Sequence, residues 1–287
     1  MAFGVRQCII GGAALMLAFP LQGSWATEKP SKFESKLKNV ELCNGANRSS
    51  PGPQINGCTA LIDAGNDTNL FLSIAHNNRG NAYSEKGDYD LAIRDYDLAI
   101  KLNPTYAKPF NNRGVAYQKK GEYDRAIKDF DEAIKLSPDY GNAFANRAET
   151  YQQKNDYERA APDYDDAIRL EPKMAAVWNG RCWNRAIRGQ LQAALTDCNQ
   201  ALRMKPTDAA TYDSRGLTHL KMGQFDSAIQ DYSSALRFEP KMASALYGRG
   251  LAKLKKGDAA GGNADLAAAK AIKATIADDF ARYGVRL

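Results

Sequence analysis

Arginines and aspartates recur in this chain with a spacing that could support either anion binding or ion pairing. Six arginines lie 34 residues apart, at Arg79, Arg113, Arg147, Arg181, Arg215 and Arg249. Six aspartates follow with the same period, each 16 residues after an arginine, at Asp95, Asp129, Asp163, Asp197, Asp231 and Asp265. A row of free guanidinium groups would bind anions, whereas a guanidinium that meets a carboxylate forms a bidentate ion pair. Because every arginine has its own aspartate, we predict structural ion pairs between facing helices rather than an anion-binding row.

Cysteines are the second set of residues that could do chemistry. The chain has five cysteines, and the four beyond residue 26 are Cys43, Cys58, Cys182 and Cys198. An even number suits a disulfide framework in an oxidising compartment. The first two flank a loop of Ser, Pro and Gly residues, and the last two lie equidistant from a turn between helices. We therefore predict one disulfide within each pair, with buried free thiols as the alternative.

Catalytic and metal-binding chemistry has few residues available. The sequence contains two histidines, His76 and His219, and no cluster of His and Cys. These residues are too few to build a His-based metal site or a His-dependent catalytic triad. Both histidines also occupy positions that are expected to pack in a core. The net charge of +6 is spread without long runs of one sign, so no nucleic-acid partner is indicated. We predict a protein that is not an enzyme and uses no cofactor and no metal.

The first 26 residues are typical of a signal peptide. Arg6 precedes an apolar stretch of 11 residues, 9–19, which is followed by Pro20, Gly23 and small residues up to Ala26. A retained membrane anchor is the alternative, but a spanning helix needs about 20 apolar residues. We predict cleavage after Ala26, a periplasmic or secreted location, and no stable membrane insertion after cleavage.

The elements that position these residues form a repeat. From Ser73 the sequence repeats every 34 residues without insertion or deletion, in units 73–106, 107–140, 141–174, 175–208, 209–242 and 243–276. In the second unit, apolar and small residues recur at helical spacing in both halves, Gly121 separates the halves and Pro138 ends the second. Each unit is therefore predicted to be a pair of antiparallel helices, whose apolar faces are buried only when units stack.

This repeat resembles that of the tetratricopeptide repeat (TPR) family. The second unit has the family's large, small, aromatic, Ala, aromatic, Ala and Pro residues at Phe110, Gly114, Tyr117, Ala126, Phe130, Ala133 and Pro138. The resemblance implies an all-α fold, a right-handed α-solenoid of tandem helix-turn-helix repeats, that binds a partner in its concave groove without chemistry. The unit departs from the family in having Arg, instead of the usual Leu, at its seventh position. The runs NNRGxAY and YDxAIxDY also resemble those of alphaproteobacterial repeat proteins.

The segments that flank the repeats are predicted to be caps, which an open stack of repeats needs. Residues 27–72 do not fit the 34-residue phase and contain two short predicted helices, 31–42 and 54–64, joined by the loop SSPGP. At the other end the sixth unit is degenerate, because Ala259 and Gly262 replace its usual aromatic and alanine. Residues 277–287 then complete a C-terminal cap, with a polar helix expected near 275–283.

The first helix of each unit lines the groove in this family, so its exposed positions are the predicted peptide-binding residues. The early units supply amides at Asn77, Asn78, Asn81, Asn111, Asn112, Gln118, Asn142, Asn146 and Gln152. The later units supply apolar residues at Trp183, Leu217, Leu220, Leu251 and Leu254. Amides can pair with the backbone of an extended peptide, and an apolar end can accept a hydrophobic anchor. The alternative is that the asparagines cap helices and the leucines meet the C-terminal helix.

We therefore expect a non-enzymatic scaffold or adaptor that binds a protein or peptide partner in the bacterial envelope. Cell-wall or outer-membrane assembly is a narrower possibility, by analogy with envelope repeat proteins alone. The alternative is an accessory subunit of a polysaccharide-export or glycosyltransferase system.

Overall fold

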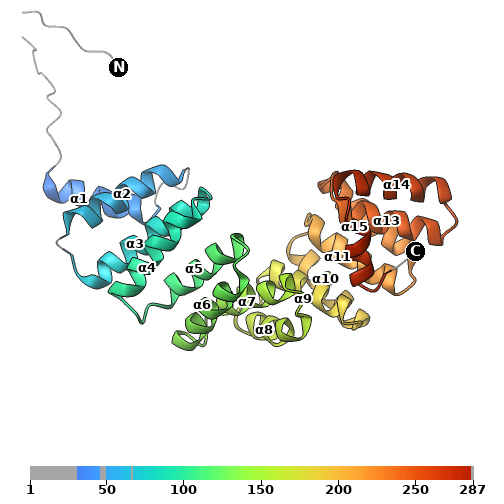
Figure 1. The fold of residues 1–287 in the computed structure, drawn as a ribbon, viewed down its shortest axis with the longest axis horizontal. Coiled ribbons are helices and arrows are strands. Elements are labelled where there is room, and N and C mark those ends of the chain that lie inside the picture. The colour runs from blue at the N-terminus through green and yellow to red at the C-terminus, as the bar shows by residue number, and fades with distance from the viewer. Residues whose placement is uncertain (1–30, 46–49, 66, 286–287) are drawn as a thin grey trace, which may run out of the picture.

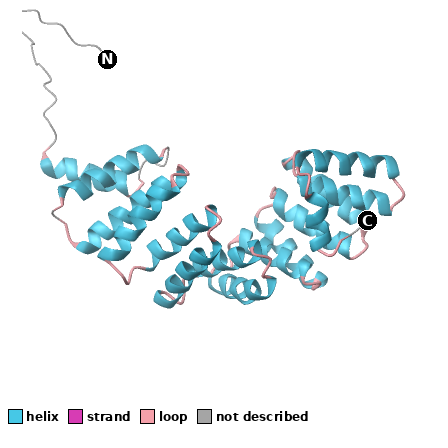
Figure 2. Ribbon diagram, viewed as in Figure 1, coloured by secondary structure: helices cyan, strands magenta, loops and turns pink. Residues whose placement is uncertain are grey.

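The structure is a computed structural model that describes residues 31–45, 50–65 and 67–285. The regular elements of this part of the chain are helices (Figures 1 and 2). The predicted signal peptide lies outside these residues. The helices are α1 (Lys32–Cys43), α2 (Pro51–Ala64), α3 (Asn69–Glu85), α4 (Tyr89–Leu102), α5 (Ala107–Lys119), α6 (Tyr123–Leu136), α7 (Gly141–Gln153), α8 (Tyr157–Leu170), α9 (Ala175–Ile187), α10 (Leu191–Met204), α11 (Ala209–Lys221), α12 (Phe225–Phe238), α13 (Ala243–Lys255), α14 (Ala259–Ile272) and α15 (Ile276–Arg282). None of these described helices is both long enough and apolar enough to span a membrane.

The N-terminal hairpin is formed by α1 and α2. A capping box starts α1, because the Ser31 hydroxyl accepts from the Glu34 backbone N–H while the Glu34 carboxylate accepts from the Ser31 N–H. A disulfide between Cys43 and Cys58, with a Cα–Cα distance of 4.6 Å, joins the two helices. The second helix begins at Pro51, three residues before the predicted start at residue 54. Proline suits this first helical position, because its missing N–H would have no partner there.

The repeated units form six antiparallel helix pairs, from α3 and α4 to α13 and α14, as predicted for the all-α fold. Each pair turns at a residue with positive φ, a region that glycine enters without strain and asparagine enters more easily than most residues. Asn155, at φ 60°, makes this turn in the third unit. Glycine makes the turn in the other five units, at Gly87, Gly121, Gly189, Gly223 and Gly257.

Small residues lie where the helices approach most closely. A Cβ atom on Gly114 would come within 2.7 Å of the Phe130 ring, so only glycine leaves room for that ring. Ala126 and Ala133 are fully buried between neighbouring helices. The close approach lets large side chains fill the remaining space, and the core therefore extends along the stack as a series of local clusters.

The stack is curved, with the first helices of the units on its inner side. Each first helix contacts the first helix of the next unit, from α3 to α13, whereas no such contact joins successive second helices in the described part of the chain. Figure 1 shows the resulting arch, with the N-terminal hairpin at one end and the last repeat at the other. We call the surface formed by α3, α5, α7, α9, α11 and α13 the inner face.

The last helix, α15, folds back onto the inner face. The Phe280 ring lies 4.8 Å from the Tyr247 ring of α13, and the Tyr283 ring lies 4.9 Å from the Trp183 ring of α9. Ile276 and Phe280 are only 3% and 2% exposed. A polar final helix was expected in this region, but one side of α15 is apolar and buried.

Candidate peptide-binding groove

Asparagines on the inner face bond to one another across unit boundaries. The Asn112 side-chain amide donates to the side-chain oxygens of Asn77, at 3.0 Å, and Asn81, at 2.9 Å. The Asn146 amide donates in the same way to Asn111, at 2.9 Å. Each donor stands at the sixth position of one unit and contacts the fifth position of the unit before it. We call the connected set the asparagine network: Asn44, Asn77, Asn78, Asn81, Asn111, Asn112 and Asn146.

The asparagine network holds the early units together and also presents polar groups to solvent. Asn77 and Asn111 are buried, whereas Asn81 is exposed and Asn112 and Asn146 are half-buried. A carboxamide has two N–H donors and an oxygen with two lone pairs, so a network bond leaves part of this capacity for another group. The structure thus places six of the seven predicted asparagines together, partly as structural partners of one another.

The other predicted amides have separate environments. Asn142 donates to the Glu171 carboxylate at 3.2 Å, and the Gln152 side-chain oxygen accepts from the Tyr164 hydroxyl at 3.2 Å. Gln118 is buried, and its amide nitrogen has no hydrogen-bond partner among the described residues. These side chains are therefore distributed along the inner face rather than gathered at one point.

A cavity of about 310 Å³ opens on the inner face between α7 and α9. Its lining includes Asn146, Glu149, Gln152, Tyr164, Val177 and Asn179. The Asn179 side-chain oxygen is shielded from solvent and accepts no hydrogen bond from the described residues. An acceptor of this kind is costly unless a donor arrives. Asn179 was not among the predicted residues, although it occupies the fifth position of its unit, as Asn77 and Asn111 do.

The apolar half of the predicted groove is covered by α15. Leu217, Leu220 and Leu251 are buried, and Trp183 and Leu254 are half-buried. All five belong to the cluster that includes Ile276 and Phe280 of α15. The leucines therefore pack in one cluster with residues of the C-terminal helix instead of standing exposed in an open groove, as the alternative interpretation expected.

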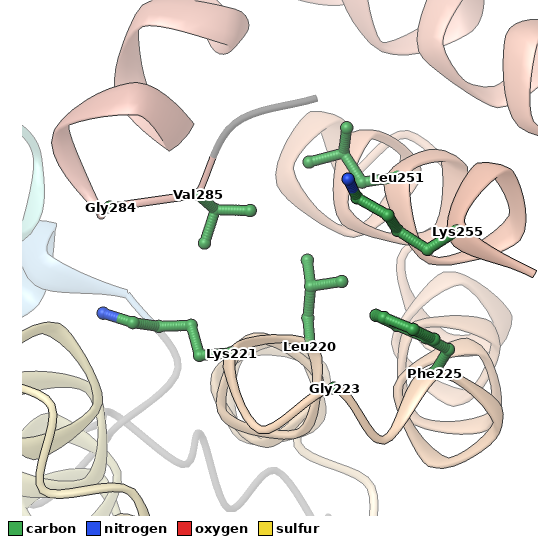
Figure 3. A pocket seen from close by; sticks show the side chains of 8 residues that line it. All are labelled: Leu220, Lys221, Gly223, Phe225, Leu251, Lys255, Gly284 and Val285. Atoms are coloured by element: carbon green, nitrogen blue, oxygen red, sulfur yellow. The ribbon is translucent and has the colours of Figure 1, made fainter.

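A space of about 280 Å³ remains beside the end of α15 (Figure 3). Leu220, Phe225, Leu251 and Val285 surround it, together with Lys255. Lys221 also lines this space, and its ammonium group donates to the backbone oxygens of Ile187, at 3.2 Å, and Tyr283, at 2.9 Å.

Each of the six repeated arginines forms a bidentate ion pair with the aspartate 16 residues later. The Arg113 guanidinium, for example, donates to both Asp129 carboxylate oxygens, at 2.8 and 2.7 Å. The other five pairs have the same geometry, with distances from 2.7 to 2.9 Å. Because its partner is a carboxylate inside the same unit, the arginine row is not free to bind an anion.

A third contact, which was not predicted from the sequence, links each of these arginines to the preceding helix. Arg147 donates to Asp131 at 2.6 Å, and Arg181 donates to Asp165 at 2.7 Å. The partners along the stack are Thr59, Asp97, Asp131, Asp165, Asn199 and Ser233. From Asp97 onward they recur every 34 residues, a signal that was available in the sequence. The arginine thus joins two units as well as two helices.

Both histidines contact aspartates of these ion pairs. His76 lies 2.8 Å from an Asp95 oxygen through its Nδ1 atom, and the His219 Nε2 atom lies 3.6 Å from Asp231. Burial by itself would raise the pKa of Asp95, but hydrogen bonds from Arg79 and His76 outweigh it and hold that pKa below its ordinary value. The histidines are therefore polar partners of the ion pairs as well as packing residues.

The second disulfide lies inside the fourth unit. Cys182 on α9 and Cys198 on α10 are bonded, with a Cα–Cα distance of 5.3 Å, and both are fully buried. They take the positions of the small residue and the aromatic ring that meet in other units, such as Gly114 and Phe130. Both predicted disulfides are thus present in the structure.

The described residues contain no group of three or more His, Cys, Asp or Glu side chains that could hold a metal ion. The geometry of the inner face is suited to recognition. The inner face offers amide donors and acceptors beside a cavity, and an apolar surface that a helix of the same chain already covers.

Family models support the repeat assignment. A model described as TPR repeat matches residues 80–121 and 216–257, and models described as Tetratricopeptide repeat match residues 107–140 and 145–209. Together these matches cover more than half of the chain. No curated protein matches the sequence significantly.

Solved structures share the fold at low sequence identity. A tetratricopeptide repeat protein from Parabacteroides merdae is 19% identical, with 88% of this chain and 99% of that chain covered at a TM-score of 0.63. PilW, a type IV pilus biogenesis factor, is 19% identical, with coverage of 70% and 93% and a TM-score of 0.63. YrrB, a TPR protein with an unusual peptide-binding site, is 20% identical, with coverage of 67% and 96% and a TM-score of 0.54.

Proposed function

Because this chain belongs to the tetratricopeptide repeat family, whose members generally mediate protein or peptide binding, we propose that it is a non-enzymatic scaffold for a protein partner. The partner presents an extended peptide segment to the inner face of units 1 to 4. The observation that carries this proposal is the cavity between α7 and α9, which adjoins the asparagine network.

The unpartnered Asn179 oxygen supports backbone recognition at this cavity. Rotation of the half-buried Asn179 side chain toward the cavity would bring that oxygen to a peptide N–H and satisfy an acceptor that is otherwise buried alone. Amides further along the inner face, such as Asn81 and Asn112, would pair with other backbone groups of the same segment. Such bonds read the backbone rather than particular side chains, while Val177 and Tyr164 offer apolar contact for one anchor residue.

The proposed location is the bacterial envelope, reached through cleavage of the predicted signal peptide after Ala26. Two disulfides, one in the N-terminal hairpin and one in the fourth repeat, support an oxidising compartment, because cytosolic thiols are usually kept reduced. Residues 1–26 lie outside the described part, so this step rests on their sequence.

Peptide selection tests the proposed groove. A displayed library is selected against the chain from residue 27, and the best peptide is then measured by titration against three proteins: the unaltered chain, Asn179→Ala and the outer-face control Gln192→Ala. We expect Asn179→Ala to weaken binding about 10-fold, the value of one hydrogen bond, and Gln192→Ala to leave it unchanged. Equal affinities for the two variants would contradict recognition at the cavity.

A further inference from the structure

The C-terminal helix α15 is seated on the inner face like a ligand rather than on the end of the stack like a cap. The helix itself packs on α13 and α14, with Phe280 against Tyr247 of α13, and the next residue, Tyr283, extends the contact across two more units to Trp183 of α9 and, through its backbone oxygen, to Lys221 of α11. The last repeat helix, α14, keeps its outer side exposed, with Ile272 48% exposed. A helix whose role was to shield the end of the solenoid would cover that side.

The polar groups of this segment are satisfied mostly by the segment itself. The buried Asp279 carboxylate pairs with Lys273, at 2.6 Å, and with Arg282. Among the described residues before Lys273, Lys221 is the polar side chain that bonds to the segment, and it contacts a backbone oxygen rather than a side chain. Any helical segment ending at this point would supply such an oxygen. Specific attachment therefore depends on the three apolar residues Ile276, Phe280 and Tyr283.

Those three residues have the spacing of an amphipathic helix docked in a groove. They stand at positions i, i+4 and i+7, which lie on one face of an α-helix. The helix has seven residues, too few to be stable alone in water, so its structure depends on this docking. The space of about 280 Å³ next to Val285, lined by Leu220, Phe225 and Leu251, extends the apolar surface beyond what α15 fills.

We propose that the surface of α9, α11 and α13 beneath α15 is a second binding surface, which accepts an amphipathic helical segment of a partner protein. The segment it fits carries an aliphatic residue followed by two aromatic residues at positions i, i+4 and i+7. In the free protein α15 occupies this surface, and a partner helix with the same anchors displaces it by also filling the adjoining space. This inference rests on the proposed scaffold function and adds the chemistry of a partner.

A peptide added in trans tests the surface. The probe is a fluorescein-labelled peptide with the sequence of residues 273–285, titrated into the full chain, into Phe280→Ala and into the control Asp278→Ala, whose side chain is exposed. The probe can bind only those molecules whose surface is not occupied by α15, so its apparent affinity is proportional to the fraction of such molecules. Phe280→Ala should therefore bind the probe at least about 10-fold more tightly than the other two proteins. Trp183→Ala added to Phe280→Ala should remove that gain.

Two results of the titration would overturn the proposal. One is equal binding of the probe to all three proteins. The other is a loss of helix in Phe280→Ala that extends beyond α15, seen by circular dichroism, because α15 would then be a fixed part of the fold.

Hydrogen exchange of the unaltered chain provides an independent test. The backbone N–H groups of Tyr283 and Val285 bond to Asp279 and Phe280 and should exchange at least about 100-fold faster than those in the middle of α13, because α15 opens separately. Equal exchange rates would overturn the proposal. Neither test uses the cavity between α7 and α9, so failure here leaves binding at that cavity to be judged by its own experiment.

Discussion

The ion pair between Arg113 and Asp129 allows the structural role of the arginine row to be measured. The Asp129 side chain is 9% exposed and that of Arg113 is 19% exposed. Removing one partner of a buried pair leaves an uncompensated charge, which costs about 3–5 kcal/mol, whereas replacing both partners is often nearly neutral. Arg113→Met leaves Asp129 without its bidentate partner, so we expect a loss near 3 kcal/mol. Asp129→Asn should cost less, about 2 kcal/mol, because Arg113 retains its contact with Asp97.

The double variant Arg113→Met/Asp129→Asn completes the thermodynamic cycle. We expect it to lose about 2 kcal/mol rather than to be neutral, because the amide introduced at position 129 and the Asp97 carboxylate both lack the guanidinium partner. This loss corresponds to a coupling of about 3 kcal/mol between the two residues. Asp97→Asn should cost less than about 1 kcal/mol, because its side chain is 53% exposed.

Urea unfolding followed by circular dichroism gives the free energies for this cycle. Hydrogen exchange within α5 and α6 checks that the effect is local, since repeats can unfold separately. Arg169 and Asp166, an exposed pair within α8, form the matched control and should show no measurable coupling. Zero coupling between Arg113 and Asp129 would refute the structural interpretation.

Three further predictions concern packing, the second disulfide and pH. Ala126→Leu should overpack a fully buried position and cost about 1–3 kcal/mol in urea unfolding; an unchanged midpoint would contradict the helix register. Replacing Cys182 and Cys198 by serine should cost about 3 kcal/mol, because their disulfide closes a short loop; alkylation of all four mature cysteines without reduction would show that neither bridge forms. The pKa of Asp95 is lower in the folded protein than in the unfolded chain, so Asp95 stabilises the fold at pH values above the ordinary aspartate pKa. This stabilisation is lost as the pH falls through the pKa that Asp95 has in the folded protein. His76→Gln should therefore reduce the stability difference between pH 6 and pH 3, and an unchanged difference would contradict the role of His76.

The sequence predicted the repeated helix pairs because its signals lie within one unit. Each unit carries its own turn residue, such as Gly121, and its own Arg and Asp, so the 34-residue period is sufficient to place them. The pairing of Cys182 with Cys198 followed in the same way, from two positions equidistant from one turn.

Contacts between units were harder to predict. Asp131 repeats with the same period as Arg147, but their contact depends on how one unit is rotated against the next. The asparagine network has the same origin, because Asn146 meets Asn111 only across a unit boundary. The amides were predicted as ligands for a peptide, and their bonds to one another could not be derived from a single unit.

The position of α15 depends on the curvature of the whole stack. Its apolar residues Ile276, Phe280 and Tyr283 are visible in the sequence at helical spacing, yet the segment was predicted to be a polar cap. Its contact with Trp183, two units before the last repeat, requires the inner face to curve toward the C-terminal end. No periodic pattern in the sequence specifies that curvature.

Photo-crosslinking from the inner face tests the central claim most directly. A photoreactive residue replaces Glu149, which lines the cavity between α7 and α9, or Arg169, which is exposed on the second helix of the same unit. Each protein is illuminated in envelope extract with and without the selected peptide. We predict an adduct with a distinct protein from position 149 that the peptide abolishes, and no such adduct from position 169. Identical adducts from both positions, unaffected by the peptide, would contradict binding at the inner face.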